Sequence, residues 1–319
     1  MNGAKRGIAQ YWVKYPKAVK YFRKLFEQRY LQGMSILGLV WIVIFCYLPM
    51  YGIIIAFKHY NILKPISEVS WAGLEYFLEF FKDESFGRVM KNTLGISSLK
   101  LLIGFPLPII FALFLNEISS LKFKKIIQTV SYLPHFLSWV VLGGILLSWL
   151  ADTGIANEIL VKMGIIKDPV FFIADPKYFW GISVASDIWK ELGWKSIIYI
   201  AAITGISHEL YEAAEMDGAG RFRKMWHVTL PGISITIAIL FILSSSSLMS
   251  ANFDQIFVLR NPLNYEASDV INIYVYRMGL QAARFSLATA VGLFQSLVAL
   301  VLLLLTNVAS KKLAGSSLF

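Results

Sequence analysis

Charged residues are scarce in this sequence: Asp, Glu, Lys and Arg together make up 16% of its 319 residues. An average soluble domain carries about 25%. Hydrophobic residues make up 57% of the chain, and the mean hydropathy is +0.61. This composition excludes a disordered chain, a fibrous protein and an ordinary soluble enzyme. Apolar stretches long enough to cross a bilayer recur along the whole chain, which predicts an all-α, polytopic membrane protein.

Other features are equally sparse. The single cysteine, Cys46, lies in an apolar run and leaves no internal disulfide. The sequence shows no long Gly/Ser linker, low-complexity tract or obvious repeat, so we expect no separate soluble domain. We expect no cleavable signal peptide, because the first thirty or so residues are basic and polar and the first apolar segment is long enough to remain as an anchor.

Six segments each supply the run of about 20 apolar residues that crosses roughly 30 Å of hydrocarbon. They are Met34–Phe57, Thr93–Leu115, Thr129–Leu150, Tyr178–Ile206, Ser234–Val258 and Phe285–Val308. The fourth is the least apolar, because it contains Asp187, Lys190, Glu191 and Lys195. The fifth contains four successive serines at 244–247, which suit close helix packing better than lipid exposure.

The positions of the basic residues predict the orientation. With the N-terminus in the cytoplasm, the inside segments are 1–33, 116–128, 207–233 and the tail 309–319, and they hold 16 Lys and Arg against 6 acids. The outside loops hold 11 basic residues against 12 acids, with Asp254 counted among them. Both termini are therefore predicted to be cytoplasmic. The net charge of +10 is explained by this topology and leaves no role for nucleic acid.

The predicted domain organisation has three parts. Residues 1–33 form a basic and aromatic cytoplasmic segment, residues 34–308 form the membrane domain, and residues 309–319 form a tail. Within the first part, Tyr11–Gln32 mixes aromatic and basic residues, which suits a helix that lies among anionic lipid headgroups. The alternative, that these charges only set topology, is compatible with it.

The loop 207–233 predicts two short helices that meet at a glycine. Ser207 is a suitable N-cap, and Glu209 lies in the first turn, where an acid is favourable. Gly218 is suited to end the first helix in a left-handed conformation. A second amphipathic helix is expected from Arg221 to Val228, with Pro231 delaying the fifth span.

This loop resembles a known motif. It fills every fixed position of the EAA loop of binding-protein-dependent ABC importer permeases. The matching pattern is Glu212-Ala213-Ala214, three residues, Gly218, nine residues, Val228, one residue and Leu230-Pro231. Other segments are similar to the carbohydrate branch of the type I importers, namely 47–52, 104–109, 132–136, 253–257 and 288–292. Within that branch the chain is most similar to permeases for alginate or pectin fragments, and the malto-oligosaccharide branch stays open. The resemblance implies the type I importer permease fold with six transmembrane helices.

The resemblance also implies which residues couple this chain to an ATPase subunit. In the family the first helix of the EAA loop seats in a cleft of the ATPase, where Glu212 would pair with a basic residue and Ala213 and Ala214 would allow close approach. The implied coupling residues are Glu212, Ala213, Ala214, Asp217, Gly218, Leu230 and Pro231. The alternative is an interfacial helix whose Glu212 only faces water. For Arg221, Arg223 and Lys224 we favour lipid headgroups over the ATPase.

The energy source must be a separate chain. No G-x-x-x-x-G-K-[ST] loop occurs, and Arg223 stands where the third glycine of a dinucleotide fingerprint would be. His59, His135, His208 and His227 are scattered, so we expect no metal site, no cofactor and no catalysis on this chain. The resemblance implies two ATPase subunits that bind ATP and Mg²⁺, a second homologous permease forming a heterodimer, and an extracytoplasmic solute-binding protein. It places the chain in the bacterial cytoplasmic membrane.

Polar residues inside predicted spans are candidates for the substrate path, because such residues are costly in hydrocarbon. The candidates are Asp187, Trp189, Lys190, Glu191, Asn252, Asp254 and Gln255. The alternatives are that these residues pair with one another for structural reasons, or that the span edges are misplaced. Tryptophans could stack on sugar rings, although interfacial anchoring is their commoner use; they are Trp139, Trp149, Trp180, Trp189 and Trp194.

The expected function is that of a permease subunit which passes an oligosaccharide or polysaccharide across the membrane. A membrane-embedded enzyme would require clustered catalytic residues, which the sequence does not show. A secondary transporter or channel would work without ATP and ordinarily shows paired repeats with broken helices. Neither alternative explains the EAA loop.

Overall fold

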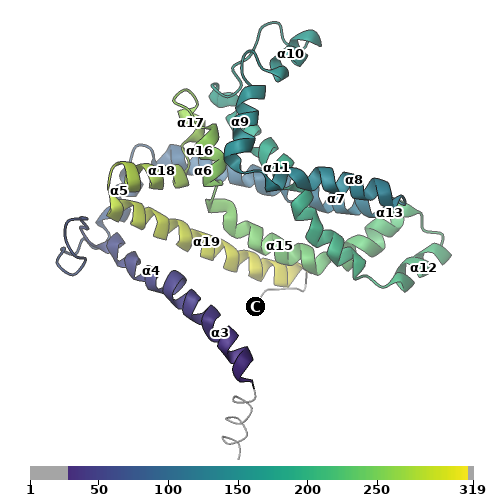
Figure 1. Cartoon of the computed structure of the whole chain (residues 1–319), viewed down its shortest axis with the longest axis horizontal. Coiled ribbons are helices and arrows are strands. Elements are labelled where there is room, and N and C mark those ends of the chain that lie inside the picture. The colour runs from purple at the N-terminus through teal and green to yellow at the C-terminus, as the bar shows by residue number, and fades with distance from the viewer. Residues whose placement is uncertain (1–27, 315–319) are drawn as a thin grey trace, which may run out of the picture. The chain divides into compact units, whose positions relative to one another are not determined.

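The computed structural model describes residues 28–314, which are predominantly helical (Figure 1). Within this range no β-strand forms, and Lys58 and Trp71 share a single antiparallel bridge. The predicted all-α class is confirmed. The chain divides into two units, one ending at Ile54 and the other beginning at Ile55. Residues 11–27 of the expected interfacial segment lie outside the described range.

The first unit is built from one continuous helical stretch that reaches into the start of the second. It comprises α3 (Arg29–Ile42), the π-turn η1 (Val43–Tyr47), α4 (Leu48–Met50) and the 3-10 turn η2 (Tyr51–Phe57). Pro49 has no N–H to donate to the preceding turn, which accounts for irregular winding beside it. The stretch is apolar on all sides, as expected for a helix surrounded by lipid.

The second unit contains all the remaining elements. Its helices are α5 (Glu75–Lys82), α6 (Phe86–Gly104), α7 (Pro106–Asn116), α8 (Leu121–Tyr132), α9 (Trp139–Trp149), α10 (Ile155–Lys162), α11 (Pro176–Thr204), α12 (His208–Met216), α13 (Arg221–Lys224), α14 (Leu230–Gly232), α15 (Ser234–Ser246), α16 (Phe253–Leu259), α17 (Tyr265–Ser268), α18 (Ile271–Tyr276) and α19 (Phe285–Ala314). Short turns join some of them, namely η3 (Leu133–Phe136), η4 (Met225–Thr229), η5 (Ser247–Met249) and η6 (Arg277–Gln281).

Three helical stretches among the described residues are long and apolar enough to cross a membrane: Arg29–Phe57, Phe86–Asn116 and Phe285–Lys312. Two bent pairs raise the number to five if each pair counts as one span. The predicted fourth span corresponds to α11, a helix of 29 residues that contains both acidic and basic side chains. The count of six spans therefore remains a prediction.

The third predicted span, Thr129–Leu150, is not a straight helix. Its two halves, α8 with η3 and α9, meet at 101°. Pro134 lies in η3, and Leu137 and Ser138 are extended, so the helical hydrogen bonds cannot run through this point. Helix α9 then starts afresh, because the Ser138 side chain accepts a hydrogen bond from the Val141 N–H at 3.2 Å.

The fifth predicted span, Ser234–Val258, ends earlier than expected. After α15 and η5, Ser250 is extended and Asn252 takes a positive φ of 56° before α16 begins. The serines favour the end of the helix here, because the side-chain hydroxyls of Ser245, Ser246 and Ser247 each donate a hydrogen bond to the backbone carbonyl three residues earlier. The predicted span thus covers two helices with a sharp turn between them.

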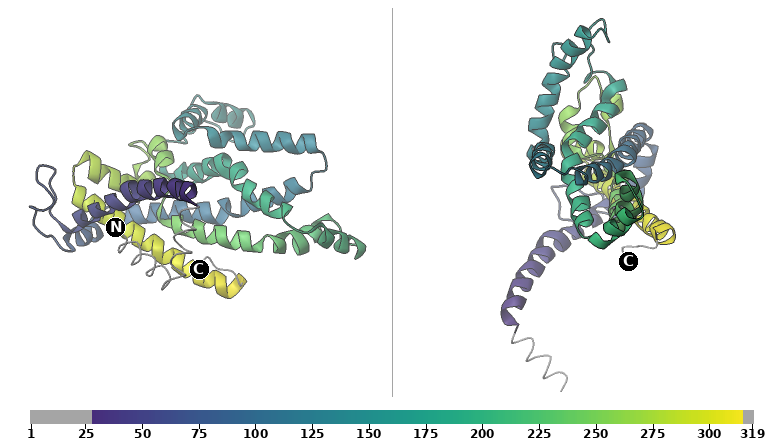
Figure 2. Two further views of the ribbon diagram at one scale, coloured as in Figure 1. Left: turned by 60° about the horizontal axis from the view of Figure 1, so that its bottom comes forward. Right: turned by 90° about the vertical axis from the view of Figure 1, so that its right-hand side faces the viewer.

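Helix α11 is central to the second unit. It packs against α6, α7, α8 and α17, while α15 runs beside α19 (Figure 1; Figure 2). Two buried apolar clusters flank α11: one includes Phe179 and Ile256, and the other includes Tyr199, Met225 and Ile233. The packing fixes the position of α11, which lines a pocket along part of its length and ends just before the loop 207–233.

Candidate functional site

The loop 207–233 forms the two predicted helices with a glycine between them. Helix α12 follows Ser207 directly, although the Ser207 side chain makes no capping hydrogen bond. At its other end Gly218 has φ +75°, the left-handed conformation expected of it. The Gly218 N–H bonds to the Glu215 carbonyl at 2.9 Å, and the Ala219 N–H bonds to the Ala214 carbonyl at 2.8 Å. This is the Schellman arrangement for ending a helix.

Two side-chain contacts brace the elbow between α12 and the helical stretch that follows. Lys224 in α13 forms an ion pair with Glu215 in α12. Its hydrogen bond and positive charge lower the pKa of the Glu215 carboxyl below the usual range, so the pair is complete at neutral pH and is lost only when acid protonates Glu215. The Tyr211 and Thr229 hydroxyls hydrogen-bond at 3.0 Å. The angle of α12 is therefore set by its own loop.

The predicted coupling residues lie mostly at the surface. Glu212, Ala213, Asp217, Gly218 and Pro231 are exposed, and Ala214 and Leu230 are half-buried. His208 lies 3.7 Å from Glu212 on the same face of α12.

Sequence reasoning missed the apolar side chains that the same loop exposes. These are Leu210, Met216, Phe222 and Trp226. Their signal in the sequence was present, since large apolar residues in a short polar loop are unusual unless a partner or lipid covers them.

The lipid assignment for the basic residues changes in one case. Lys224 is engaged by Glu215, and its side chain is only 18% exposed. Arg221 and Arg223 are exposed. For these two the assignment to lipid headgroups remains a prediction.

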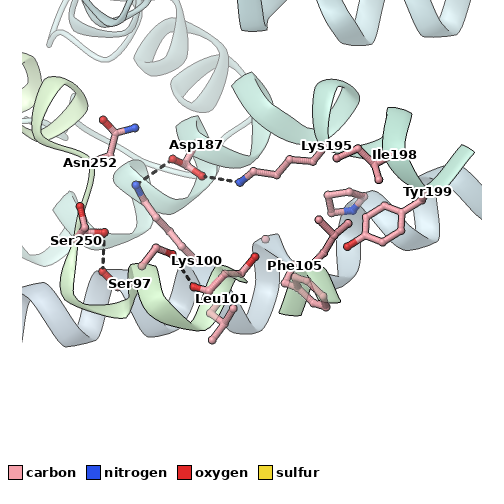
Figure 3. Close-up of a pocket in the computed structure, with 15 residues that line it drawn as sticks. Ser97, Lys100, Leu101, Phe105, Asp187, Lys195, Ile198, Tyr199, Ser250 and Asn252 are labelled. Carbon is pink, nitrogen blue, oxygen red and sulfur yellow. Dashed lines mark hydrogen bonds and ion pairs between the residues drawn. The ribbon is translucent and has the colours of Figure 1, made fainter. Parts of the chain in front are cut away.

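A cavity of about 360 Å³ with a mixed polar and apolar lining lies beside α11 (Figure 3). Helices α6, α7, α11 and α15 and the segment from Ser247 to Asn252 enclose it. The lining residues are Ser97, Lys100, Leu101, Gly104, Phe105, Pro108, Asp187, Lys195, Ile198, Tyr199, Leu240, Ser244, Ser247, Ser250 and Asn252. Hydroxyls, an amide and charged groups thus share the cavity with apolar and aromatic surface.

An ion-pair network forms one wall of this cavity. Lys100 donates to Asp187 Oδ1 at 3.0 Å, and Lys195 Nζ lies 3.7 Å from Asp187 Oδ2 (Figure 3). Lys100 also donates to Gln255 Oε1 at 2.5 Å. Two lysines therefore share one carboxylate, and the Lys195 side chain is 48% exposed. Lys195 is therefore the more accessible of the two cations.

Gln255 belongs to the network rather than to the lining. It is fully buried, and its amide nitrogen donates to the Ser183 carbonyl at 2.6 Å and to the Ser186 hydroxyl at 2.8 Å. Asn252 does line the cavity, and its side chain accepts the Gln255 N–H at 3.4 Å as the N-cap of α16. Asp254 is exposed and does not line the cavity.

The other candidates on α11 do not line this cavity. Lys190 donates to backbone carbonyls of the α8–α9 break, and Glu191 contacts His135. Trp189 pairs with Trp149, with ring centroids 5.9 Å apart. The structural-pairing alternative therefore describes Lys190 and Glu191, whereas Asp187 both pairs and lines the cavity.

The five tryptophans do not line the cavity. Trp194 stacks on His135, and Trp180 donates to the Ala267 carbonyl at 3.3 Å. The residues that do line it and escaped the substrate-path prediction are Ser97, Lys100, Lys195, Ser244, Ser247 and Ser250. For Lys100 the signal was clear, since it is the one charge inside the predicted second span.

Comparison with known proteins identifies the family. The model described as binding-protein-dependent transport system inner membrane component matches residues 104–315. Protein LplB of Bacillus subtilis (strain 168) is 40% identical over 304 residues, covering 95% of each chain. The polygalacturonan/rhamnogalacturonan transport system permease protein YteP of the same organism is 41% identical over 299 residues, covering 93% of this chain and 92% of the relative.

Solved structures agree with these relatives. The crystal structure of a bacterial ABC transporter involved in the import of the acidic polysaccharide alginate contains a chain with a TM-score of 0.84 and 40% identity. The match covers 92% of this chain and 99% of that one. The type I importer permease fold and the resemblance to sugar-importer permeases are confirmed. The chain belongs to the binding-protein-dependent transport system inner membrane components, and it is a multi-pass, non-catalytic permease subunit of an ATP-driven importer in the bacterial inner membrane.

Proposed function

We propose that this chain forms one half of the pathway for an acidic oligosaccharide or polysaccharide. The substrate would arrive from an extracytoplasmic binding protein and pass between this permease and a second, different one. Two ATPase subunits, which bind ATP and Mg²⁺, would drive the transport from the cytoplasmic side. The observation that carries the proposal is the cavity beside α11, where polar groups suited to sugar hydroxyls lie next to the half-exposed Lys195 ammonium.

The cavity chemistry supports a carboxylated sugar over a neutral one. Serine hydroxyls and the Asn252 amide can exchange hydrogen bonds with sugar hydroxyls, and Phe105 and Tyr199 offer ring surface. Asp187 satisfies Lys100 at 3.0 Å, whereas Lys195 is more distant and half-exposed. A sugar carboxylate would pair with the Lys195 ammonium. The named substrates of the relatives, alginate and polygalacturonan, support the same class.

The loop 207–233 supports the coupling role. Helix α12 presents an acid and small side chains at the surface, Glu212 and Ala213, beside exposed apolar residues. A partner that buries this surface would gain both apolar area and an oriented ion pair. When ATP brings the two ATPases together, the coupling helices would follow, and the cavity would switch from inward-open to outward-open.

The first test measures ATP-driven uptake in proteoliposomes of the co-expressed complex, with Glu212→Ala beside a matched control. Glu209→Ala removes an equally exposed acid from the same helix. We expect Glu212→Ala to reduce uptake and ATPase retention on the permease, and Glu209→Ala to behave like the wild type. Equal, ATP-driven uptake by all three would remove Glu212 from the coupling. Uptake that does not depend on ATP would instead indicate a secondary transporter.

The second test concerns the cavity charge. We expect Lys195→Gln to raise the KM for a uronic-acid oligosaccharide by a factor of about 10 to 100, because a hydrogen bond to a charged group contributes about 1.5–3 kcal/mol. Lys177→Gln, an exposed lysine on the same helix, serves as the control. A wild-type KM in Lys195→Gln would show that this ammonium does not contact the substrate.

A further inference from the structure

The break between α8 and α9 is held by residues from a single stretch of α11. Lys190, Glu191, Gly193 and Trp194 all contact the segment 131–137. This contact is separate from the cavity, and the proposed function does not use it.

Lys190 supplies the hydrogen bonds that the break leaves open. Its ammonium donates to the carbonyls of His135 and Leu137, both at 2.6 Å, and of Pro134 at 3.3 Å. The residue is only 6% exposed, and its ammonium lies 5.7 Å from the Trp139 ring centroid. A helix that stops in a buried place leaves carbonyls without partners, and a buried lysine offers three donors to them. Each group thereby compensates the other.

The neighbouring residues leave the break little freedom to move. The His135 ring stacks flat on Trp194, with centroids 4.3 Å apart and planes 2° apart. His135 Nδ1 lies 3.0 Å from Glu191 Oε2. At Gly193 the two backbones approach so closely that a Cβ would lie 2.2 Å from the Ser131 carbonyl oxygen. A charge, a ring stack and a backbone contact fall within little more than one turn of α11.

From this contact α11 runs without interruption to Thr204, and the coupling loop begins three residues later. At 1.5 Å per residue the distance from Lys190 to Thr204 is about 21 Å. Asp187 and Lys195 on the same helix form the charged wall of the cavity. One rigid helix therefore carries the broken span, the cavity wall and the attachment of α12.

We propose that the α8–α9 break is a fixed joint: the bent segment 121–149 moves with α11 as one body, and Lys190 is the residue that positions it. A freely hinged break would leave its carbonyls to water and its two arms independent. Helix α8 and η3 pack against α11, so a displacement of α12 reaches α8 through α11. Helix α9 packs mainly against α16 and meets α11 at Trp139 and Trp149. The inference rests on the proposed function, since it assigns a route for the motion that the ATPases would drive.

The test uses the complete complex with Cys46 replaced by serine and spin labels at exposed positions. One pair, Val130 and Val140, spans the break, and a second pair, Val130 and Ala201, joins α8 to α11. We expect both distance distributions, measured by pulsed electron paramagnetic resonance, to be narrow and equal in the nucleotide-free and ATP–vanadate-trapped states. A change on trapping, with uptake still ATP-driven, would overturn the joint and leave the proposed function intact. Uptake without ATP would overturn the proposed function instead.

Variants then test the role of Lys190. We expect Lys190→Met to broaden the Val130–Val140 distribution and to raise the ATP hydrolysed per sugar imported several-fold, while the ATPases still co-purify. Lys177→Met, at the exposed start of α11, should change neither quantity. Glu191→Gln keeps the shape of the second contact and should give a smaller change in the same direction, so it tests the joint if Lys190→Met does not fold. Unchanged distances and an unchanged ratio in both variants would overturn the proposal.

Discussion

At the scale of single residues, buried charges in α11 are accommodated because each has a partner on another element. Asp187 contacts Lys100 of α6, Lys190 caps the carbonyls of η3, and Glu191 contacts His135. A charge alone in the membrane is costly, whereas a paired and hydrogen-bonded one is tolerated. The choice between a structural and a transport role therefore divides within the five residues 187–191, since only Asp187 among them lines the cavity.

The first prediction concerns Lys100. Its side chain is 14% exposed and that of Asp187 is 11% exposed, so Lys100→Met would leave a buried carboxylate without its nearest cation. Breaking a buried pair costs about 3–5 kcal/mol, and we expect a clear fall in the melting temperature of the purified permease complex. Lys100→Met combined with Asp187→Leu should recover part of the loss. A melting temperature equal to that of the wild type in the single variant would contradict the pairing.

At the scale of elements, close approach of α11 to the α8 end depends on a residue without a side chain. Gly193 faces the Ser131 carbonyl and the Tyr132 ring, whereas Gly181, on the same helix, has no neighbouring atom within 4 Å. The two glycines are alike in sequence, since both lie inside a helical pattern. Only their packing distinguishes them: Gly193 has no room for a side chain, whereas Gly181 does.

This contrast yields a matched pair of substitutions. Gly193→Ala should destabilise the protein by about 1–3 kcal/mol, because the backbones must separate to admit a methyl group. Gly181→Ala should be neutral or stabilise by up to about 1 kcal/mol, because alanine is the better helix former. Thermal unfolding of both variants in one detergent measures the difference. Equal melting temperatures for the two would show that the approach at Gly193 is not as close as described.

At the scale of the whole molecule, the positions of the charges along the chain predict the topology. With 1–33, 116–128, 207–233 and the tail inside, 16 of the 30 Lys and Arg are cytoplasmic, against 6 acids. A hydropathy test considers each helix alone, so it does not count α11 as a membrane span, although the charged side chains of α11 have partners on neighbouring elements. The proposal of six spans with both termini inside follows from the charge distribution together with the family.

Cysteine labelling of cells tests this topology in a Cys46→Ser background. We expect a membrane-impermeant maleimide to label Lys162→Cys and Leu263→Cys on intact spheroplasts. Lys122→Cys and Arg221→Cys should react only after permeabilisation. All four positions are exposed, so access is decided by the membrane. Labelling of Arg221→Cys from outside would invert the predicted orientation.

Features that depend on local chemistry can be read from the sequence alone. Apolar runs predicted the helical class, and the spacing around Glu212 and Gly218 predicted the family. Gly218 takes the left-handed conformation because it ends helix α12, a feature of the local sequence. Tertiary structure alone decided which polar residues meet. Lys100 and Asp187 lie 87 positions apart, and Lys190 and His135 lie 55 apart. No periodicity reports such contacts, because they form between helices. The breaks at Pro134 and Asn252 likewise depend on partners that only the folded chain supplies: the Lys190 ammonium compensates the first, and the network around Gln255 holds the second.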